Sequence, residues 1–166
     1  MAELVADLFV SADGFAAGED VGAFFGYDGP DLQAWIAEEA ARPQHLLMGR
    51  VTYEALPMPG PRIVYSNTLT EAEPGVRILG GDLAGSVARL KHDSDVMIRT
   101  IGSLRLVGGL LRAGLVDRLR LMVFPITLGA DGREPAYAGY PRSGYDLVGS
   151  KVLDARIVLL DYRPAK

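Results

Sequence analysis

The stretch Leu47-Met48-Gly49-Arg50-Val51-Thr52-Tyr53-Glu54 decides how the rest of the chain is interpreted. The apolar run from His45 to Met48 predicts a strand, and residues 51–56 are compatible with a short helix that Pro57 stops. In an open α/β sheet, a glycine turn between strand and helix presents backbone N–H groups and the positive end of a helix dipole to an anion. The stretch therefore predicts a place where a phosphate can bind.

A second turn of the same kind follows later in the chain, at Ile101-Gly102-Ser103-Leu104. A β-like run, residues 96–101, precedes it, and a helical pattern that ends at Gly114 follows it. Two such turns can hold a dinucleotide between them. Neither turn is a GxGxxG, so the Rossmann fingerprint is absent. The spacing alone is equally consistent with two ordinary strand-to-helix turns that bind no phosphate.

The remaining periodicity places these turns in an α/β chain whose strands alternate with helices through the first two-thirds. Glu3–Ser11 predicts a strand, residues 14–30 a long loop, and the segment from Pro30 to Pro43 a helix. Three further segments predict strands (62–66, 76–79 and 119–126), residues 83–91 predict a helix, and residues 145–153 with 156–162 predict an antiparallel pair around Asp154-Ala155. We expect a mostly parallel sheet with an antiparallel edge, in a single domain over residues 1–166.

The amino-acid composition limits the kinds of functional site that this chain can contain. The 166 residues are 49% hydrophobic and 23% charged, and no apolar run approaches the ~20 residues that span a bilayer. The N-terminus lacks the features of a signal peptide, so we expect a cytoplasmic protein without a membrane partner. The net charge of −4 argues against nucleic-acid binding. There is no cysteine, and His45 and His92 lie too far apart to suggest a metal site.

Several segments carry a family resemblance that spans roughly residues 3 to 163. The Met48 to Glu54 segment is similar to the Met-Gly-Arg-x-Thr-aromatic-Glu segment of dihydrofolate reductases. Other segments resemble the reductase domain of the riboflavin-biosynthesis deaminase-reductase and its stand-alone relatives: Ser11-Ala12-Asp13-Gly14-Phe15, residues 64–69, Gly114-Leu115-Val116-Asp117, and Pro125-Ile126-Thr127-Leu128-Gly129. The resemblance implies a dihydrofolate-reductase-like three-layer fold, with a mostly parallel central sheet, antiparallel C-terminal edge strands and helices on both faces.

The resemblance also implies a set of cofactor-binding residues. The matching family segments hold the pyrophosphate and, through the arginine, the 2′-phosphate of NADPH. A strand end contacts the adenosine side, and a second turn binds phosphate. In this chain the corresponding residues are Gly49, Arg50 and Thr52, then Ser66 and Asn67, then Gly102 and Ser103. Dihydrofolate reductases more often have consecutive glycines at the second turn, so Ser103 replaces one backbone contact with a hydroxyl.

The resemblance implies fewer substrate-binding residues than cofactor-binding residues. Ser11, Asp13 and Gly14 match the loop near the nicotinamide and the substrate, although Asp13-Gly14 also fits a simple turn. Asp31 matches the acid that binds the pteridine in dihydrofolate reductases, and it equally fits the first turn of a helix. We expect Asp13 or Asp31 to orient the substrate or help to protonate it, with Ser11 and Gly14 as substrate-binding residues.

Together these features predict an NADPH-dependent reductase that transfers hydride to a pyrimidine- or pterin-like substrate, similar to 5-amino-6-(5-phosphoribosylamino)uracil reductase. Hydride transfer needs orientation and electrostatics more than a nucleophile, which suits a chain without cysteine. Dihydrofolate reduction and a non-catalytic NADPH-binding dimeric protein are the alternatives. No basic cluster for a ribose phosphate is recognisable. The family also implies a homodimer, for which the apolar run 119–126 and the loop 129–145 are candidate surfaces.

Overall fold

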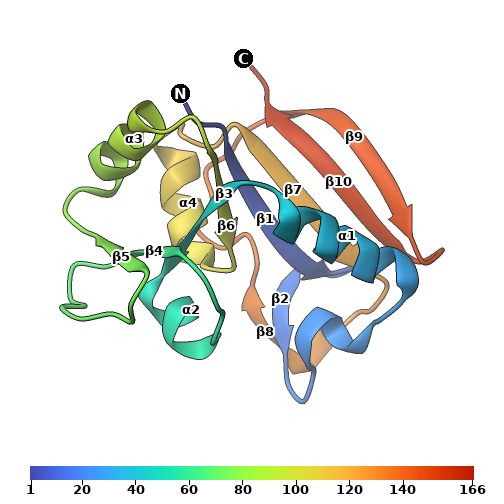
Figure 1. Cartoon of the computed structure of the whole chain (residues 1–166). Helices are drawn as coiled ribbons and strands as arrows, with labels where there is room; N and C mark the ends of the chain where they lie inside the picture. The colour runs from blue at the N-terminus through green and yellow to red at the C-terminus, as the bar shows by residue number, and fades with distance from the viewer. The chain divides into compact units, whose positions relative to one another are not determined.

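The computed structural model, drawn in Figure 1, describes all 166 residues. These residues form two compact units. Unit 1 consists of Met1–Ala6, Pro43–Arg118 and Gly139–Arg142, and unit 2 of Asp7–Arg42, Leu119–Ala138 and Ser143–Lys166. The first strand, β1 (Leu4–Ser11), begins in unit 1 and ends in unit 2. The assignment of residues 1–166 to a single domain stays a prediction.

Unit 1 is built on parallel strands. Its strand order is β5 (Val76–Leu79), β4 (Arg62–Tyr65), β3 (Gln44–Gly49) and β6 (Met97–Ile101), and all three pairings are parallel. Parallel neighbours need crossover connections. Helices α2 (Arg50–Ala55) and α3 (Leu83–Asp93) lie between strands of this unit, and α4 (Leu104–Arg112) follows β6. Each helix follows a strand, as the alternation in the sequence predicts.

Unit 2 contains the antiparallel part of the fold. Strand β10 (Ile157–Pro164) pairs antiparallel with both β7 (Arg118–Phe124) and β9 (Tyr145–Leu153). Helix α1 (Pro30–Ala41) contributes Leu32 and Trp35 to a buried apolar cluster that also contains residues of β7, β9 and β10. The prediction of an α/β fold with a mostly parallel sheet and antiparallel C-terminal edge strands is confirmed.

Two segments differ from the predicted loops. The segment 14–30 contains strand β2 (Phe15–Gly18) and a turn at Ala23–Gly26, and the segment 129–145 contains a 3-10 turn (Gly129–Asp131) and strand β8 (Gly132–Pro135). Strands β2 and β8 pair only with each other, antiparallel. Each is four residues long and finds its partner far away in sequence, so neither leaves a local periodic signal.

The Gly114-Leu115-Val116-Asp117 segment has a structural role in unit 1. Gly114 has a φ of +68°, which terminates α4 without the penalty that a Cβ would bring. The Asp117 carboxylate accepts hydrogen bonds from the Leu4 backbone N–H (2.7 Å) and from the buried Lys91 ammonium (2.5 Å). This segment therefore joins the start of β1 to α3.

The helices of this chain are too short or too polar to cross a membrane.

Candidate functional site

The two glycine turns are neighbours within unit 1. The Gly49 backbone N–H donates to the Ser103 hydroxyl (2.8 Å), and that hydroxyl donates to Thr52 Oγ1 (2.8 Å). A Cβ on Gly102 would lie 3.4 Å from the Thr52 side chain, tighter than most such contacts. One serine hydroxyl therefore connects the turn after β3, the first turn of α2 and the turn before α4.

The backbone of the second turn adopts an unusual conformation. Gly102 (φ +59°) and Ser103 (φ +63°) both lie in the left-handed region, which costs a non-glycine residue about 1–3 kcal/mol. The two hydrogen bonds of the Ser103 hydroxyl help to hold it there. Ser103 is also the N-cap of α4, and the first N–H groups of a helix have no partner inside the helix. The turn therefore offers backbone donors beside a polar, glycine-lined surface.

Arg50, the predicted ligand of the 2′-phosphate, begins α2 and pairs with Glu54. The two charged groups are 3.1 Å apart, and both side chains are about half exposed, at 46% and 50%. Exposed ion pairs of this kind contribute only about 0–1 kcal/mol. A phosphate can therefore replace Glu54 as the partner of Arg50 at little cost.

Ser66 and Asn67 are engaged in holding their own loop. The Ser66 hydroxyl accepts from the backbone N–H groups of residues 68 (3.2 Å) and 69 (3.0 Å). The Asn67 side chain accepts from Gly81 N–H (2.6 Å) and donates to Gly81 O (3.3 Å). These contacts tie the ends of β4 and β5 together, so both residues shape the predicted adenosine side through the backbone.

In unit 2, Asp13 organises the loop after β1. Its carboxylate accepts from the Ser11 hydroxyl (2.7 Å) and from the backbone N–H groups of Leu128 (3.1 Å) and Gly129 (2.9 Å). The hydrogen bond from Gly129, followed by that from Ser11, lowers the Asp13 pKa from 3.8 to about 2. Asp13 is therefore an anion at neutral pH and does not hold a proton there.

The remaining residues of that loop are placed close by. The Ser11 hydroxyl also accepts from the Phe15 backbone N–H (2.9 Å), which closes the turn. Gly14 has a φ of +87°, and a Cβ at this position would lie 3.6 Å from the ring of Tyr137. Gly14 O accepts from the Ala136 N–H (2.9 Å). The structure thus brings Ser11, Asp13 and Gly14 together, with Tyr137 beside them.

Asp31 belongs to a different cluster of unit 2, a reciprocal contact with Asp154. The Asp154 carboxylate accepts from the backbone N–H groups of Asp31 (2.9 Å) and Leu32 (3.0 Å), and so caps α1. In return Asp31 Oδ2 accepts from the Asp154 N–H (2.8 Å) in the left-handed turn between β9 and β10. The carboxylate of Asp31 therefore fastens the start of α1 to this hairpin.

Sequence reasoning missed a buried charge cluster in unit 2. Arg120 of β7 forms two hydrogen bonds to Asp7 (2.6 and 2.8 Å) and one to Glu39 (2.8 Å), and all three residues are 6% exposed or less. Burial alone lowers the pKa of Arg120, but the hydrogen bonds and charges of Asp7 and Glu39 outweigh it and raise this pKa above its ordinary value. The sequence does contain a signal for this cluster, because Asp7 and Arg120 are charged residues inside apolar runs that predict strands.

The model of the RibD C-terminal domain family matches residues 2–159. The chain belongs to this family. The predicted recognition is therefore confirmed, and membership in this reductase-like family supports an oxidoreductase with a nicotinamide cofactor.

Solved structures show the same fold at low sequence identity. A protein from Shewanella sp. PV-4 assigned to riboflavin biosynthesis has a TM-score of 0.77 and 23% identity, with 100% of both chains covered. A pyrimidine reductase-like protein from Corynebacterium diphtheriae has a TM-score of 0.74 and 13% identity, with 99% of this chain and 92% of that chain covered.

RibD from Acinetobacter baumannii is similar over part of its length, with a TM-score of 0.73 and 16% identity. The match covers 99% of this chain and 58% of that one, so the present chain spans little more than half of that RibD. No curated protein matches the chain.

Proposed function

We propose that this RibD C-terminal domain is an NADPH-dependent reductase that acts on a pyrimidine- or pterin-like substrate, with 5-amino-6-(5-phosphoribosylamino)uracil reductase as the nearest activity. One observation carries the proposal: the Ser103 hydroxyl joins the two glycine turns that unit 1 presents for a dinucleotide. Family membership and the pyrimidine reductase-like neighbour support the reaction type.

The residues of unit 1 fit the phosphates of such a cofactor. Gly49 and Gly102 leave space that a Cβ would fill, 3.5 Å from Ser103 Oγ and 3.4 Å from Thr52 respectively. Backbone N–H groups at the start of α4 and the guanidinium of Arg50 supply donors. NADPH, when bound, supplies the hydride, and these residues would position it.

In unit 2, Asp13 is the acid that the geometry favours for a role at the substrate. Its carboxylate stays ionised because backbone and hydroxyl donors lower its pKa to about 2. In this proposal it orients the substrate by accepting hydrogen bonds, and the proton for reduction comes from water. Asp31 has the weaker claim, because its carboxylate already caps the β9–β10 turn.

The arginine of the first turn provides the sharpest test of the cofactor. Replacing Arg50 with alanine removes the charge that would face the 2′-phosphate, so the Kd for NADPH should rise about tenfold or more, while the Kd for NADH stays the same. Arg133→Ala is the matched control, since Arg133 forms a similarly exposed ion pair with Glu19 in unit 2. Isothermal titration measures both. Equal weakening of NADPH and NADH would contradict the assignment.

Turnover separates the reductase from its alternatives. Purified protein is mixed with NADPH and a candidate heterocycle, and oxidation of the cofactor is followed by loss of its absorbance. Dihydrofolate as the preferred substrate would point to the dihydrofolate reductase alternative. Tight NADPH binding without turnover on any candidate would point to the non-catalytic NADPH-binding protein, and absence of NADPH binding would overturn the cofactor proposal.

We also propose a homodimer, and the structure changes the surface on which it rests. In the predicted run 119–126, Met122 and Phe124 are buried and Leu121, Val123 and Ile126 are only partly exposed, so it offers less apolar surface than an edge strand does. Strand β9 instead pairs with β10 alone and exposes Leu147 (56%) and Val152 (64%). Replacing both with lysine should convert a dimer into monomers in light-scattering measurements, and a monomeric wild type would contradict the proposal.

A further inference from the structure

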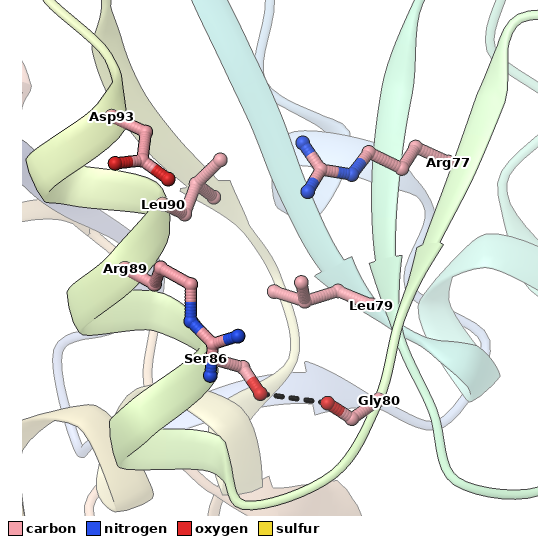
Figure 2. A pocket seen from close by; sticks show the side chains of 7 residues that line it. All are labelled: Arg77, Leu79, Gly80, Ser86, Arg89, Leu90 and Asp93. Atoms are coloured by element: carbon pink, nitrogen blue, oxygen red, sulfur yellow. Dashed lines mark hydrogen bonds between the residues drawn. The ribbon is translucent and has the colours of Figure 1, made fainter.

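A pocket of about 170 Å³ lies between strand β5 and helix α3 in unit 1 (Figure 2). Its wall combines apolar, hydroxyl and charged side chains with one glycine: Arg77, Leu79, Gly80, Ser86, Arg89, Leu90 and Asp93. None of these residues belongs to the site already described. The two arginines come from opposite sides of the pocket, Arg77 from β5 and Arg89 from α3.

The guanidinium groups of these two arginines are available to a ligand. Most arginines of this acidic chain are engaged with a carboxylate or a carbonyl, as the ion pairs of Arg50, Arg62, Arg118, Arg120 and Arg133 show. The side chains of Arg77 and Arg89 form no ion pair or hydrogen bond with another residue. Both side chains project into the space between β5 and α3 (Figure 2). Two guanidinium groups and one carboxylate, that of Asp93, therefore line one concave surface, which leaves an excess of positive charge.

This arrangement suits a phosphate group. A guanidinium offers a planar fork of N–H donors that matches phosphate oxygens, and two of them across a pocket focus a positive potential on it. The Ser86 hydroxyl donates to Gly80 O (2.7 Å) and so fixes the loop at one end of the pocket. Leu79 and Leu90 supply apolar walls for the body of an organic ligand. Asp93 is the single acid of the lining.

We propose that this pocket binds the phosphate group of a phosphate monoester, with Arg77 and Arg89 as its ligands. A spacing of twelve residues between them hides the pair in the sequence, which is why no basic cluster is recognisable there. Two sources of the phosphate share this chemistry. One is a separate phosphorylated small molecule. The other is the adenosine end of the cofactor, because a Cβ on Gly80 would lie 3.2 Å from Asn67 Oδ1; only this second source rests on the proposed function.

The test titrates the full chain with inorganic phosphate. Each of Arg77→Gln and Arg89→Gln should raise the Kd about tenfold, because a charge-assisted hydrogen bond is lost. Asp93→Asn should lower the Kd, because it removes the repelling carboxylate. Because unfolding can only weaken phosphate binding, a lower Kd in Asp93→Asn beside a higher Kd in the arginine variants shows that these variants do not act by unfolding the chain. Arg142→Gln is the matched control, an exposed arginine of unit 1 outside the pocket. Absence of saturable binding, or equal weakening in the control, would overturn the proposal.

A second measurement identifies the source of the phosphate. If the double variant Arg77→Gln/Arg89→Gln weakens NADPH but not NADH, the pocket serves the cofactor's own phosphate. If NADPH binding is unchanged and inorganic phosphate binds in its presence, the pocket serves a separate molecule. Both results support the pocket. A wild type that binds phosphate but no nicotinamide cofactor would refute the proposed function and leave the pocket supported by the first test.

Discussion

The two units use their predicted site residues in contrasting ways. In unit 1, one hydroxyl, that of Ser103, braces two glycine turns, and the backbone donors at the start of α4 are left for a ligand. In unit 2, the two candidate acids accept hydrogen bonds from their own unit: Asp13 from Leu128 and Gly129, and Asp31 from Asp154.

The contrast shows what a conspicuous acid in a loop usually does. Backbone N–H groups at turns and helix starts need acceptors, and a nearby aspartate satisfies them. An acid that does so is held in place. For Asp13 these hydrogen bonds also lower the pKa, which suits orientation of a substrate and does not suit proton donation. Four substitutions test this difference between the two units.

The largest effect is expected in the buried cluster of unit 2. Arg120→Met removes the charge and the three hydrogen bonds that this arginine supplies to the buried carboxylates of Asp7 and Glu39, so the free energy of unfolding should fall by about 3–5 kcal/mol. Urea denaturation measures it. Arg133→Met, which removes a largely exposed ion pair, should change stability by no more than about 0.5 kcal/mol. If Arg120→Met lowered the free energy of unfolding no more than the control does, the buried cluster would not stabilise the fold as its burial indicates.

The next effect concerns the Ser103 hydroxyl, which joins the two glycine turns of unit 1. Ser103→Ala removes the acceptor of the Gly49 N–H and the donor to Thr52, which should weaken NADPH about tenfold and lower stability by about 1 kcal/mol. Titration of NADPH and urea denaturation measure the two effects. Ser150→Ala, on the exposed edge strand β9, should alter neither. Unchanged cofactor affinity in Ser103→Ala would remove the observation that carries the proposed function.

Asp31 tests whether a capping acid is also a catalytic one. Asp31→Ala should lower the free energy of unfolding by about 1 kcal/mol, as losses of capping contacts do, and leave the pH profile of kcat unchanged. Glu38→Ala, an exposed acid of the same helix, should change neither quantity. A collapse of kcat with normal stability would instead assign the protonating role to Asp31 and reverse the contrast drawn above.

The smallest effect is the pH dependence contributed by Asp13. Its pKa is lowered from 3.8 to about 2 in the folded chain, so the stabilisation is fully present above pH 3.8 and is lost as the pH falls towards 2. The difference in urea midpoint between wild type and Asp13→Asn should therefore be constant from pH 7 down to about 4 and shrink below it. A difference that grows on acidification would contradict the assigned hydrogen bonds.

Much of the fold follows from local patterns in the sequence. The helix that begins at Pro30, the strand that ends at Gly49 and the hairpin around Asp154 and Ala155 are all where periodicity and turn residues predict them. The short strands β2 and β8 are not, because each is stabilised by the other across a long stretch of chain. Periodicity and turn residues act over a few neighbouring residues, so they cannot predict a strand whose pairing partner is distant in the sequence.

Local patterns and short motifs were enough to predict the alternation of strands and helices, the two glycine turns and the family to which the chain is similar. Three contacts could be found only in the folded chain: Ser103 joins those turns, Asp31 and Asp154 bind each other, and Arg77 and Arg89 line one pocket. The physical reason is range. Backbone preferences and apolar periodicity act over a few residues, whereas a hydrogen bond or a shared pocket depends on which distant segments pack together.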